Sequence, residues 1–358
     1  MRLFILIVLP WILIHSNSVD AQIDYSKDAD LIRCYYEQRA FELPPSKAGH
    51  MGCRLYRQYG DKRYKFLILQ DIKNIEQRFR SIKGKGLDPA SLLETSRLEI
   101  KDYNKSNNER YVRRRKTLDS YPTYRLIAVS ILGGLAKLNN YGLKSTDEDL
   151  FRKVVHGYNF KHVFRDPMMI RAWGAQLANQ VYWLKQLGER DLSHTFSQAV
   201  RRTYPNSKDH MLSKQQFINK IYTLTHIIIS ASEYYQKSVN AAEFSWILDY
   251  FSANISTIIK RCNIDAITKV GLSYLLAEKK DASEVEKIRA IVSSAINKDA
   301  CMIPSSKGGT DFLYGEHRNI LAVMLLDWQG TTRRPYTKEI PGLKDRLPTS
   351  LIFDSSIQ

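Results

Sequence analysis

A histidine and a glutamate stand seven positions apart in the segment 213–237, at a spacing that puts both on one face of a helix. They are His226 and Glu233, about 10 Å apart along a helix axis, which suits two groups flanking a bound ligand. Histidine works as a general acid or base near neutral pH, and burial raises the pKa of a glutamate toward that range. We predict both to be catalytic. The alternative is a hydrogen bond from His226 to a backbone carbonyl and an ion pair from Glu233 to a lysine.

The rest of the segment 213–237 is apolar except for the narrow strip that carries these two residues. At ~100° per residue, Asn219, Tyr222 and Ser230 fall on the same strip. Such a helix is buried on most sides, and its strip faces solvent or a polar partner. We therefore predict that Tyr222 contacts a substrate held against the strip.

A second group of reactive side chains lies where the segment 308–328 passes from a glycine-containing loop into an apolar helix. Backbone amides at a helix start favour an anion, and Arg318 and His317 reinforce that preference. We predict Glu316 and His317 to be catalytic, and three neighbours to bind substrate: Asp311, Tyr314 and Arg318. The alternative is ordinary helix capping, in which the helix dipole favours Glu316 and His317 has no role.

A third group combines amides with aromatic rings in the segment that follows Asp166-Pro167. Rings stack on the apolar faces of sugars, and amides hydrogen bond to sugar hydroxyl groups. We predict that a sugar is bound by Trp173, Gln176, Asn179 and Trp183. The alternative is core packing with the amides satisfied internally.

Other chemistries are disfavoured by the sequence. It contains no HExxH, GxSxG or phosphate-loop pattern, which argues against a zinc peptidase or a serine hydrolase. No two cysteines have finger-like spacing. The remaining histidines have no partners at metal-ligand spacing: His50, His156, His162, His194 and His210. We expect neither a metal nor a cofactor.

The segments that position these groups are predicted to be helices, because extended strand patterns are almost absent. Segments with wide apolar surfaces, such as 121–140 and 213–237, alternate with segments that are apolar along one stripe, such as 283–297. Two concentric layers require this, since inner helices touch neighbours on nearly every side and outer helices meet solvent. The prediction is an all-α fold, an α/α toroid, complete or incomplete. An α-solenoid or a large helical bundle are the alternatives, although no fixed-period repeat supports the solenoid.

The domain organisation predicted is a signal peptide over residues 1–21 and one helical domain over 22–358. Arg2, a short apolar core and small residues up to Ala21 are typical of a secretory signal cleaved near Ala21-Gln22. No later stretch is long and apolar enough to span a membrane. The polar stretch 104–120 is a candidate exposed linker within the domain.

An exported protein meets an oxidising compartment, where the four cysteines could form disulfides. The most local pairing joins Cys34 to Cys53 and Cys262 to Cys301; free buried thiols are the alternative. A periplasmic or secreted location follows from the signal.

The formal net charge of +17 favours a polyanionic partner. For an exported protein that partner is an acidic glycan or another anionic envelope polymer rather than nucleic acid. A dispersed, solvated positive surface is the alternative.

The signal peptide, the segment 222–235 (YTLTHIIISASEYY) and the segment 308–328 (GGTDFLYGEHRNILAVMLLDW) together resemble an uncharacterised bacterial family of exported all-helical proteins, described as a domain of unknown function. The Thr-His pair before an apolar helix is similar to inner helices of α/α toroids. The resemblance implies one bacterial envelope domain covering nearly all of the mature chain, and it supplies no catalytic residues.

Two functional hypotheses remain open. The first is a carbohydrate-active enzyme that cleaves an acidic glycan in a central helical cavity, by hydrolysis or by elimination. Hydrolysis needs two carboxylates about 5–9 Å apart, for which Glu233 with Glu316 or Asp311 is available. Elimination would use Tyr222 or His226 as the base and Arg318 against the negative charge of the uronate. The second hypothesis is a non-catalytic envelope protein whose basic surface binds an anionic polymer or a protein partner.

Overall fold

The computed structural model describes residues 24–103, 108–332, 337 and 342–354. The predicted signal peptide therefore lies outside the described residues. Within them the chain is helical, and its one sheet pairs β1 (Leu143–Ser145) antiparallel with β2 (Leu351–Phe353). The predicted all-α class is confirmed.

The α-helices, in chain order, are α1 Ser26–Gln38, α2 Pro45–Tyr59, α3 Lys65–Lys85, α4 Pro89–Tyr103, α5 Glu109–Ser120, α6 Leu132–Asn140, α7 Glu148–Gly157, α8 Phe160–Arg165, α9 Pro167–Gln186, α10 Ser193–Thr203, α11 Lys214–Ala231, α12 Ser245–Arg261, α13 Ile264–Leu276, α14 Ser283–Ser294 and α15 Phe312–Leu326. A π-helix, η3 (Arg125–Ile131), leads into α6. Short 3₁₀ turns are η1 Ala40–Glu42, η2 Lys62–Tyr64, η4 Asn206–Met211 and η6 Lys344–Arg346.

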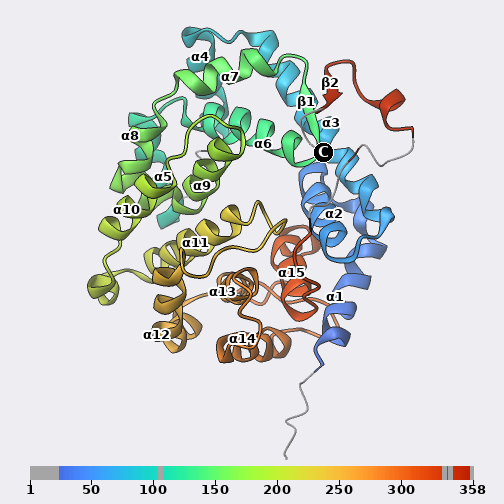
Figure 1. Cartoon of the computed structure of the whole chain (residues 1–358), viewed down its shortest axis with the longest axis vertical. Helices are drawn as coiled ribbons and strands as arrows, with labels where there is room; N and C mark the ends of the chain where they lie inside the picture. The colour runs from blue at the N-terminus through green and yellow to red at the C-terminus, as the bar shows by residue number, and fades with distance from the viewer. Residues whose placement is uncertain (1–23, 104–107, 333–336, 338–341, 355–358) are drawn as a thin grey trace, which may run out of the picture.

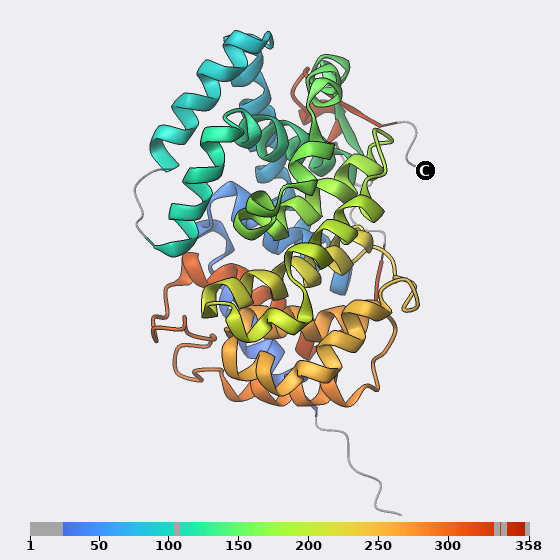
Figure 2. The ribbon, with the colours of Figure 1, turned by 90° about the vertical axis from the view of Figure 1, so that its left-hand side faces the viewer.

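A subset of the helices packs in a circle of successive contacts, visible in Figure 1 and seen from the side in Figure 2. Helix α6 packs on α9, α9 on α11, α11 on α13, α13 on α15 and α15 on α2, and α3 closes the circle between α2 and α6. Other helices lie outside it: α1 contacts α15, α5 and α10 contact α9, and α14 contacts α13 and α15.

Helices of the circle such as α13 are buried over most of their surface, whereas α14, outside it, is buried along one stripe. In α13 every residue from Ala266 to Leu276 is buried. In α14 only Val285, Ile288 and Val292 are buried, one stripe at helical spacing. The wide apolar surface of 265–278 and the single apolar stripe of 283–297 in the sequence match the burial of α13 and α14.

Residues 109–120, in the predicted exposed linker, form a packed helix instead. The side chain of Asn108 accepts a hydrogen bond from the Tyr111 backbone N–H and begins α5. Arg114 is buried against α9, where its Nε donates to the carbonyl of Ala172 at 3.0 Å. The arginine-rich sequence is polar, but the aliphatic stem of an arginine packs well against a neighbouring helix.

The predicted disulfides are absent. Cys34, Cys53, Cys262 and Cys301 all lie in the described part of the chain, and all are free thiols. An even number of cysteines permits pairing, but it does not show whether the side chains lie close enough to form disulfides. No helix of the described residues is long and apolar enough to cross a membrane.

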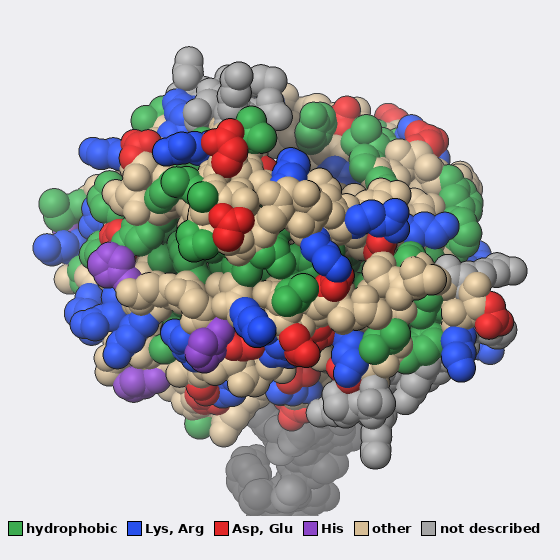
Figure 3. All heavy atoms as spheres, turned by 90° about the horizontal axis from the view of Figure 1, so that it is seen from above, with side chains coloured by type: hydrophobic (Ala, Val, Ile, Leu, Met, Phe, Trp, Pro, Cys, Tyr) green, Lys and Arg blue, Asp and Glu red, His purple; other side chains and the backbone are tan. Residues whose placement is uncertain are grey.

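Positive and negative side chains are interspersed on the face of the molecule shown in Figure 3. Lys and Arg do not gather there into one patch, because Asp and Glu lie among them. On this face the basic residues are therefore dispersed.

Helices α9 and α11 approach closely at a glycine, which gives a prediction about stability. A Cβ added at Gly174 would lie 2.0 Å from Thr223 Oγ1 and 3.1 Å from Thr223 Cβ. Overpacking of this kind costs about 1–3 kcal/mol. We expect Gly174→Ala to lower the free energy of unfolding by that amount in urea denaturation.

The matched control is Gly84→Ala, in α3, where nothing lies within 4 Å of the added Cβ. There the same substitution should be neutral or stabilising by up to about 1 kcal/mol, because alanine favours the helix. Equal effects at the two sites would contradict the close approach of α9 and α11.

Candidate functional site

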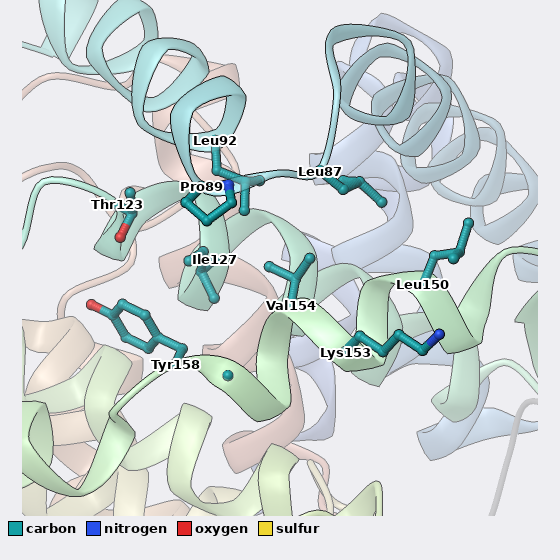
Figure 4. Close-up of a pocket in the computed structure, with 10 residues that line it drawn as sticks. Leu87, Pro89, Leu92, Thr123, Ile127, Leu150, Lys153, Val154 and Tyr158 are labelled. Carbon is teal, nitrogen blue, oxygen red and sulfur yellow. The ribbon is translucent and has the colours of Figure 1, made fainter.

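Two of the cavities formed by the described residues differ clearly in their chemistry. The first is a groove of about 450 Å³ beside α4, η3 and α7 (Figure 4). Its lining is almost entirely apolar, including Leu92, Ile127 and Val154, and Lys153 is the charged side chain in it. It offers no combination of acid and base.

The second cavity lies inside the circle of helices and has a volume of about 290 Å³. Helices α2, α6, α9, α11 and α15 contribute to it, together with the residues after α11. The lining residues are Ser46, Gly49, His50, Cys53, Arg54, Arg57, Lys137, Asn140, Tyr141, Asn179, Trp183, His226, Tyr234, Tyr235 and His317. This volume is close to the lower end of the ~300–1,000 Å³ usual for small-molecule sites.

Three imidazoles and three cations line this cavity, and no Asp or Glu is among the described residues that line it. The nearest carboxylates stand behind the wall. Asp71 is fully buried and accepts hydrogen bonds from Lys137 Nζ at 2.9 Å and from Tyr141 OH at 2.9 Å. Lys137 is thereby neutralised, whereas Arg54 and Arg57 leave the cavity electropositive.

His226 is held as a neutral base. Its Nδ1 lies 2.8 Å from Asn179 Oδ1, and Ser230 Oγ donates to the same oxygen at 2.9 Å. Because an amide oxygen only accepts, Nδ1 carries the proton and Nε2 keeps its lone pair. Burial lowers the pKa of His226 well below its ordinary value, and the Lys269 charge lowers it further. The Asn179 oxygen takes both bonds, so its NH₂ group is left to donate to a ligand.

A chain of hydrogen bonds runs from the wall of the cavity into the protein. His50 Nδ1 lies 2.5 Å from Glu316 Oε1, and His50 Nε2 lies 2.7 Å from His317 Nδ1. Lys269 Nζ lies 3.1 Å from His317 Nε2 and donates to Asp265 Oδ2 at 2.6 Å. Five residues are thus linked in series, each in contact with the next: Glu316, His50, His317, Lys269 and Asp265.

The surroundings of these hydrogen-bonded residues shift their pKa values. Burial raises the pKa of Glu316 to about 7, against the opposing charge of Arg54. Burial also lowers the pKa of His50 and of His317 well below the ordinary value. Burial opposes ionisation of Asp265, but the Lys269 ammonium outweighs it and holds the pKa of that carboxyl far below its usual range.

The backbone after α11 is strained where it enters the cavity. Glu233, Tyr234 and Tyr235 have φ of 53°, 58° and 73°, left-handed values that cost non-glycine residues about 1–3 kcal/mol each. Arg57 Nη1 donates to the carbonyl of Tyr234 at 2.5 Å, and Ser232 Oγ accepts from the Tyr235 N–H at 2.9 Å. These contacts hold the turn that brings two phenol rings to the cavity.

Four of the residues predicted from the sequence line the cavity: His226, His317, Asn179 and Trp183. Two more adjoin it from behind. Glu316 is 1% exposed and reaches the cavity through His50, and Tyr222 donates to Asp265 Oδ2 at 2.6 Å. His226 and Glu316, far apart in sequence, are therefore parts of one site.

Six predicted residues lie outside the lining, and five of them make local structural contacts. Glu233 pairs with Lys237 at 2.5 Å, because α11 ends at Ala231 and the next residues turn the side chain away. Trp173 is buried with its indole N–H on Thr117 Oγ1, and Gln176 accepts from Arg114. The other three belong to the start of α15: Asp311 caps it, Tyr314 is 83% exposed and Arg318 donates to the Ile303 carbonyl.

Several residues of the site were not predicted. His50 was set aside because its sequence neighbours are not ligands, while its partners are Glu316 and His317. Lys269 and Asp265 do carry a local signal, since an Asp and a Lys at i,i+4 in an apolar helix form a buried pair. Tyr234 and Tyr235 have no such signal, because nothing in the sequence indicates the left-handed turn.

The described residues contain no group of three or more His, Cys, Asp or Glu side chains arranged to hold a metal ion.

A comparison with protein families matches residues 25–353 to a domain of unknown function, DUF3541. Comparisons with curated proteins and with solved structures find no match. The family match spans almost all of the described chain, including every residue of the cavity and of the hydrogen-bonded chain behind it. The protein belongs to the DUF3541 family.

Proposed function

We propose that the cavity binds one uronate unit of an acidic glycan and cleaves the chain there by β-elimination. The observation that carries the proposal is the composition of the wall: a neutral histidine base with Arg54 and Arg57, and no carboxylate among the described lining residues. Cations and amide donors fit the carboxylate of the sugar. Export through residues 1–21 and an envelope location belong to the same proposal, as does an α/α toroid formed by the circle of helices.

Hydrolysis fits the cavity less well than elimination. Glycoside hydrolysis uses two carboxyl groups about 5–9.5 Å apart on either side of the scissile bond. Of the carboxylates that the sequence offered, Glu233 is paired with Lys237 outside the cavity, and Glu316 is sealed behind His50. The composition of the wall thus favours the reaction that needs a base and a stabilised carboxylate.

In an elimination, residues that line the cavity have distinct roles. His226 Nε2 removes the proton on the carbon next to the carboxylate, the C–H electron pair forms a C=C bond, and the bond from the ring to the glycosidic oxygen breaks. Negative charge builds up on the uronate carboxylate as the proton leaves. Asn179 NH₂ and the Arg54 guanidinium are the groups of the wall that stabilise it.

Aromatic rings on the other side of the cavity suit the apolar face of a sugar. Trp183 and Tyr234 are stacked, with ring centroids 6.4 Å apart and planes 18° from parallel. Such rings add favourable contact area at little cost in side-chain entropy. We assign them to holding the sugar ring in place while His226 reaches the C–H bond.

The test is a screen of uronate-containing glycans against the same glycans with the carboxylates reduced to alcohols. We expect chain cleavage only of the acidic members, with a new ultraviolet absorbance from the C=C bond and no incorporation of solvent oxygen. Cleavage with oxygen incorporation would establish hydrolysis and overturn the elimination proposal. Binding of acidic glycans without cleavage would instead favour the non-catalytic envelope protein.

A polymer-binding surface gathers its basic residues, and the described residues of the face shown in Figure 3 form no such patch. The cavity, rather than the outer surface shown there, is where cations converge.

A further inference from the structure

We propose that Glu316, His50 and His317 form a two-state proton relay that delivers a proton into the cavity at His317 Nε2. The relay itself is a property of the resting protein. Its role as the acid for the leaving oxygen rests on the function proposed above.

One proton arrangement satisfies every contact as the structure has it. Lys269, as an ammonium, donates to His317 Nε2, so the His317 proton is on Nδ1 and is donated to His50 Nε2. His50 then carries its proton on Nδ1 and donates it to Glu316, which must be ionised. Each of the three contacts holds one proton, and all donors point toward Glu316. We call this the ionised state.

Adding one proton reverses the whole chain. Glu316 as a carboxylic acid donates to His50 Nδ1, His50 Nε2–H donates to His317 Nδ1, and the His317 proton moves to Nε2. This N–H now faces the Lys269 ammonium, which cannot accept. We call this the protonated state, in which both imidazoles have changed tautomer and neither is an imidazolium.

The structure holds an acceptor that only the protonated state needs. Asp265 Oδ1 is buried and has no hydrogen-bond partner among the described residues. His317 Nε2 lies 3.7 Å from it, too far for a hydrogen bond but facing it. In the protonated state the His317 Nε2–H thus faces Asp265 Oδ1 without a hydrogen bond to it. Because His317 lines the cavity, we assign this proton to a substrate oxygen bound there.

The relay suits a general acid better than the phenols of the cavity do. An acid works best when its pKa is near the operating pH. Burial raises the pKa of Tyr234 far above its ordinary value of 10, whereas it brings that of Glu316 to about 7. The charged and titratable groups around Glu316 are Tyr36 from α1, Lys47, His50 and Arg54 from α2, Asp265 and Lys269 from α13, and His317 and Arg318 from α15.

With this relay, every proton taken up or released in the reaction has a donor and an acceptor. His226 takes the proton from carbon, and the leaving glycosidic oxygen takes the proton from His317 Nε2. The electron pair of the breaking C–O bond accepts that proton, and the relay returns to the ionised state. Exchange with water then restores both sites. Glu316 does not touch the substrate and is a positioning residue that acts through His50.

The test uses the full-length protein without substrate and follows the imidazole ¹⁵N chemical shifts of His50 and His317 from about pH 5.5 to about pH 8.5. We expect both rings to change from Nδ1–H to Nε2–H as the pH falls, with one shared midpoint near that of Glu316. In Glu316→Gln the change should be absent, because an amide cannot gain the proton. Glu94→Gln, an exposed position on α4, is the control and should behave as the native protein does.

Rings that keep one tautomer over the whole range, or that become imidazolium at separate midpoints, would overturn the relay. In the enzyme assay, the native kcat should fall as the pH rises above the midpoint, because the ionised relay has no proton to give. Glu316→Gln should lower kcat by ~10²-fold or more at low pH with KM little changed, and should lose that fall. A tautomer change without any glycan cleavage would reject the proposed function and leave the relay standing.

Discussion

Replacing Lys269 with methionine is expected to lower the free energy of unfolding by about 3–5 kcal/mol. The side chain is 3% exposed, and its ammonium lies 2.6 Å from Asp265 Oδ2 in the middle of α13. Removing it leaves an ionised carboxylate in the interior with Tyr222 as its one remaining strong donor. Urea unfolding at neutral pH, followed by circular dichroism, measures the loss.

Two further variants separate the buried charge from the size of the side chain. Lys237→Met breaks an exposed pair with Glu233, whose contact distance is 2.5 Å, and should cost less than about 1 kcal/mol. The double variant Lys269→Met with Asp265→Leu removes both charges, and we expect it to recover most of the lost stability. A loss below about 1 kcal/mol for Lys269→Met alone would contradict the assignment of a buried ion pair.

The helical architecture could be predicted because it depends on local patterns. The apolar periodicity of 213–237 and its polar strip lie within one helix, so Tyr222 and His226 do fall on one face. The prediction failed at the helix end. Glu233 lies beyond Ala231, in a left-handed turn held by Arg57 from α2, and no local pattern encodes that contact.

Only part of the site could be predicted, because half of it depends on contacts between segments that are distant in sequence. His50 has no reactive neighbours in sequence, yet it joins Glu316 and His317 because α2 packs against α15. The same limit explains α5. Its arginines look solvated in sequence, but Arg114 stacks on Trp173 with its guanidinium 4.2 Å from the ring centroid. Composition describes the side chain, whereas packing decides its surroundings.

Substituting His226 with glutamine is expected to lower kcat for glycan cleavage by ~10²–10⁴-fold, the usual contribution of a general base. Glutamine can keep a hydrogen bond to Asn179 but has no lone pair able to take the proton from carbon. Binding of a uronate monosaccharide, measured by calorimetry, should change little. His210→Gln, at an exposed position in η4, is the matched control and should leave kcat unchanged.

The variant Asn179→Asp tests the role of His226 as the base by changing its hydrogen-bond partner. The amide oxygen now holds a neutral imidazole, whose pKa is far below its ordinary value because of burial. A carboxylate in its place would favour the imidazolium and raise that pKa. Since His226 must be neutral to act, the pH below which activity is lost should move upward in this variant. The aspartate would also repel the uronate, so KM should rise. An unchanged pH profile with native KM would show that His226 and Asn179 do not act on the substrate.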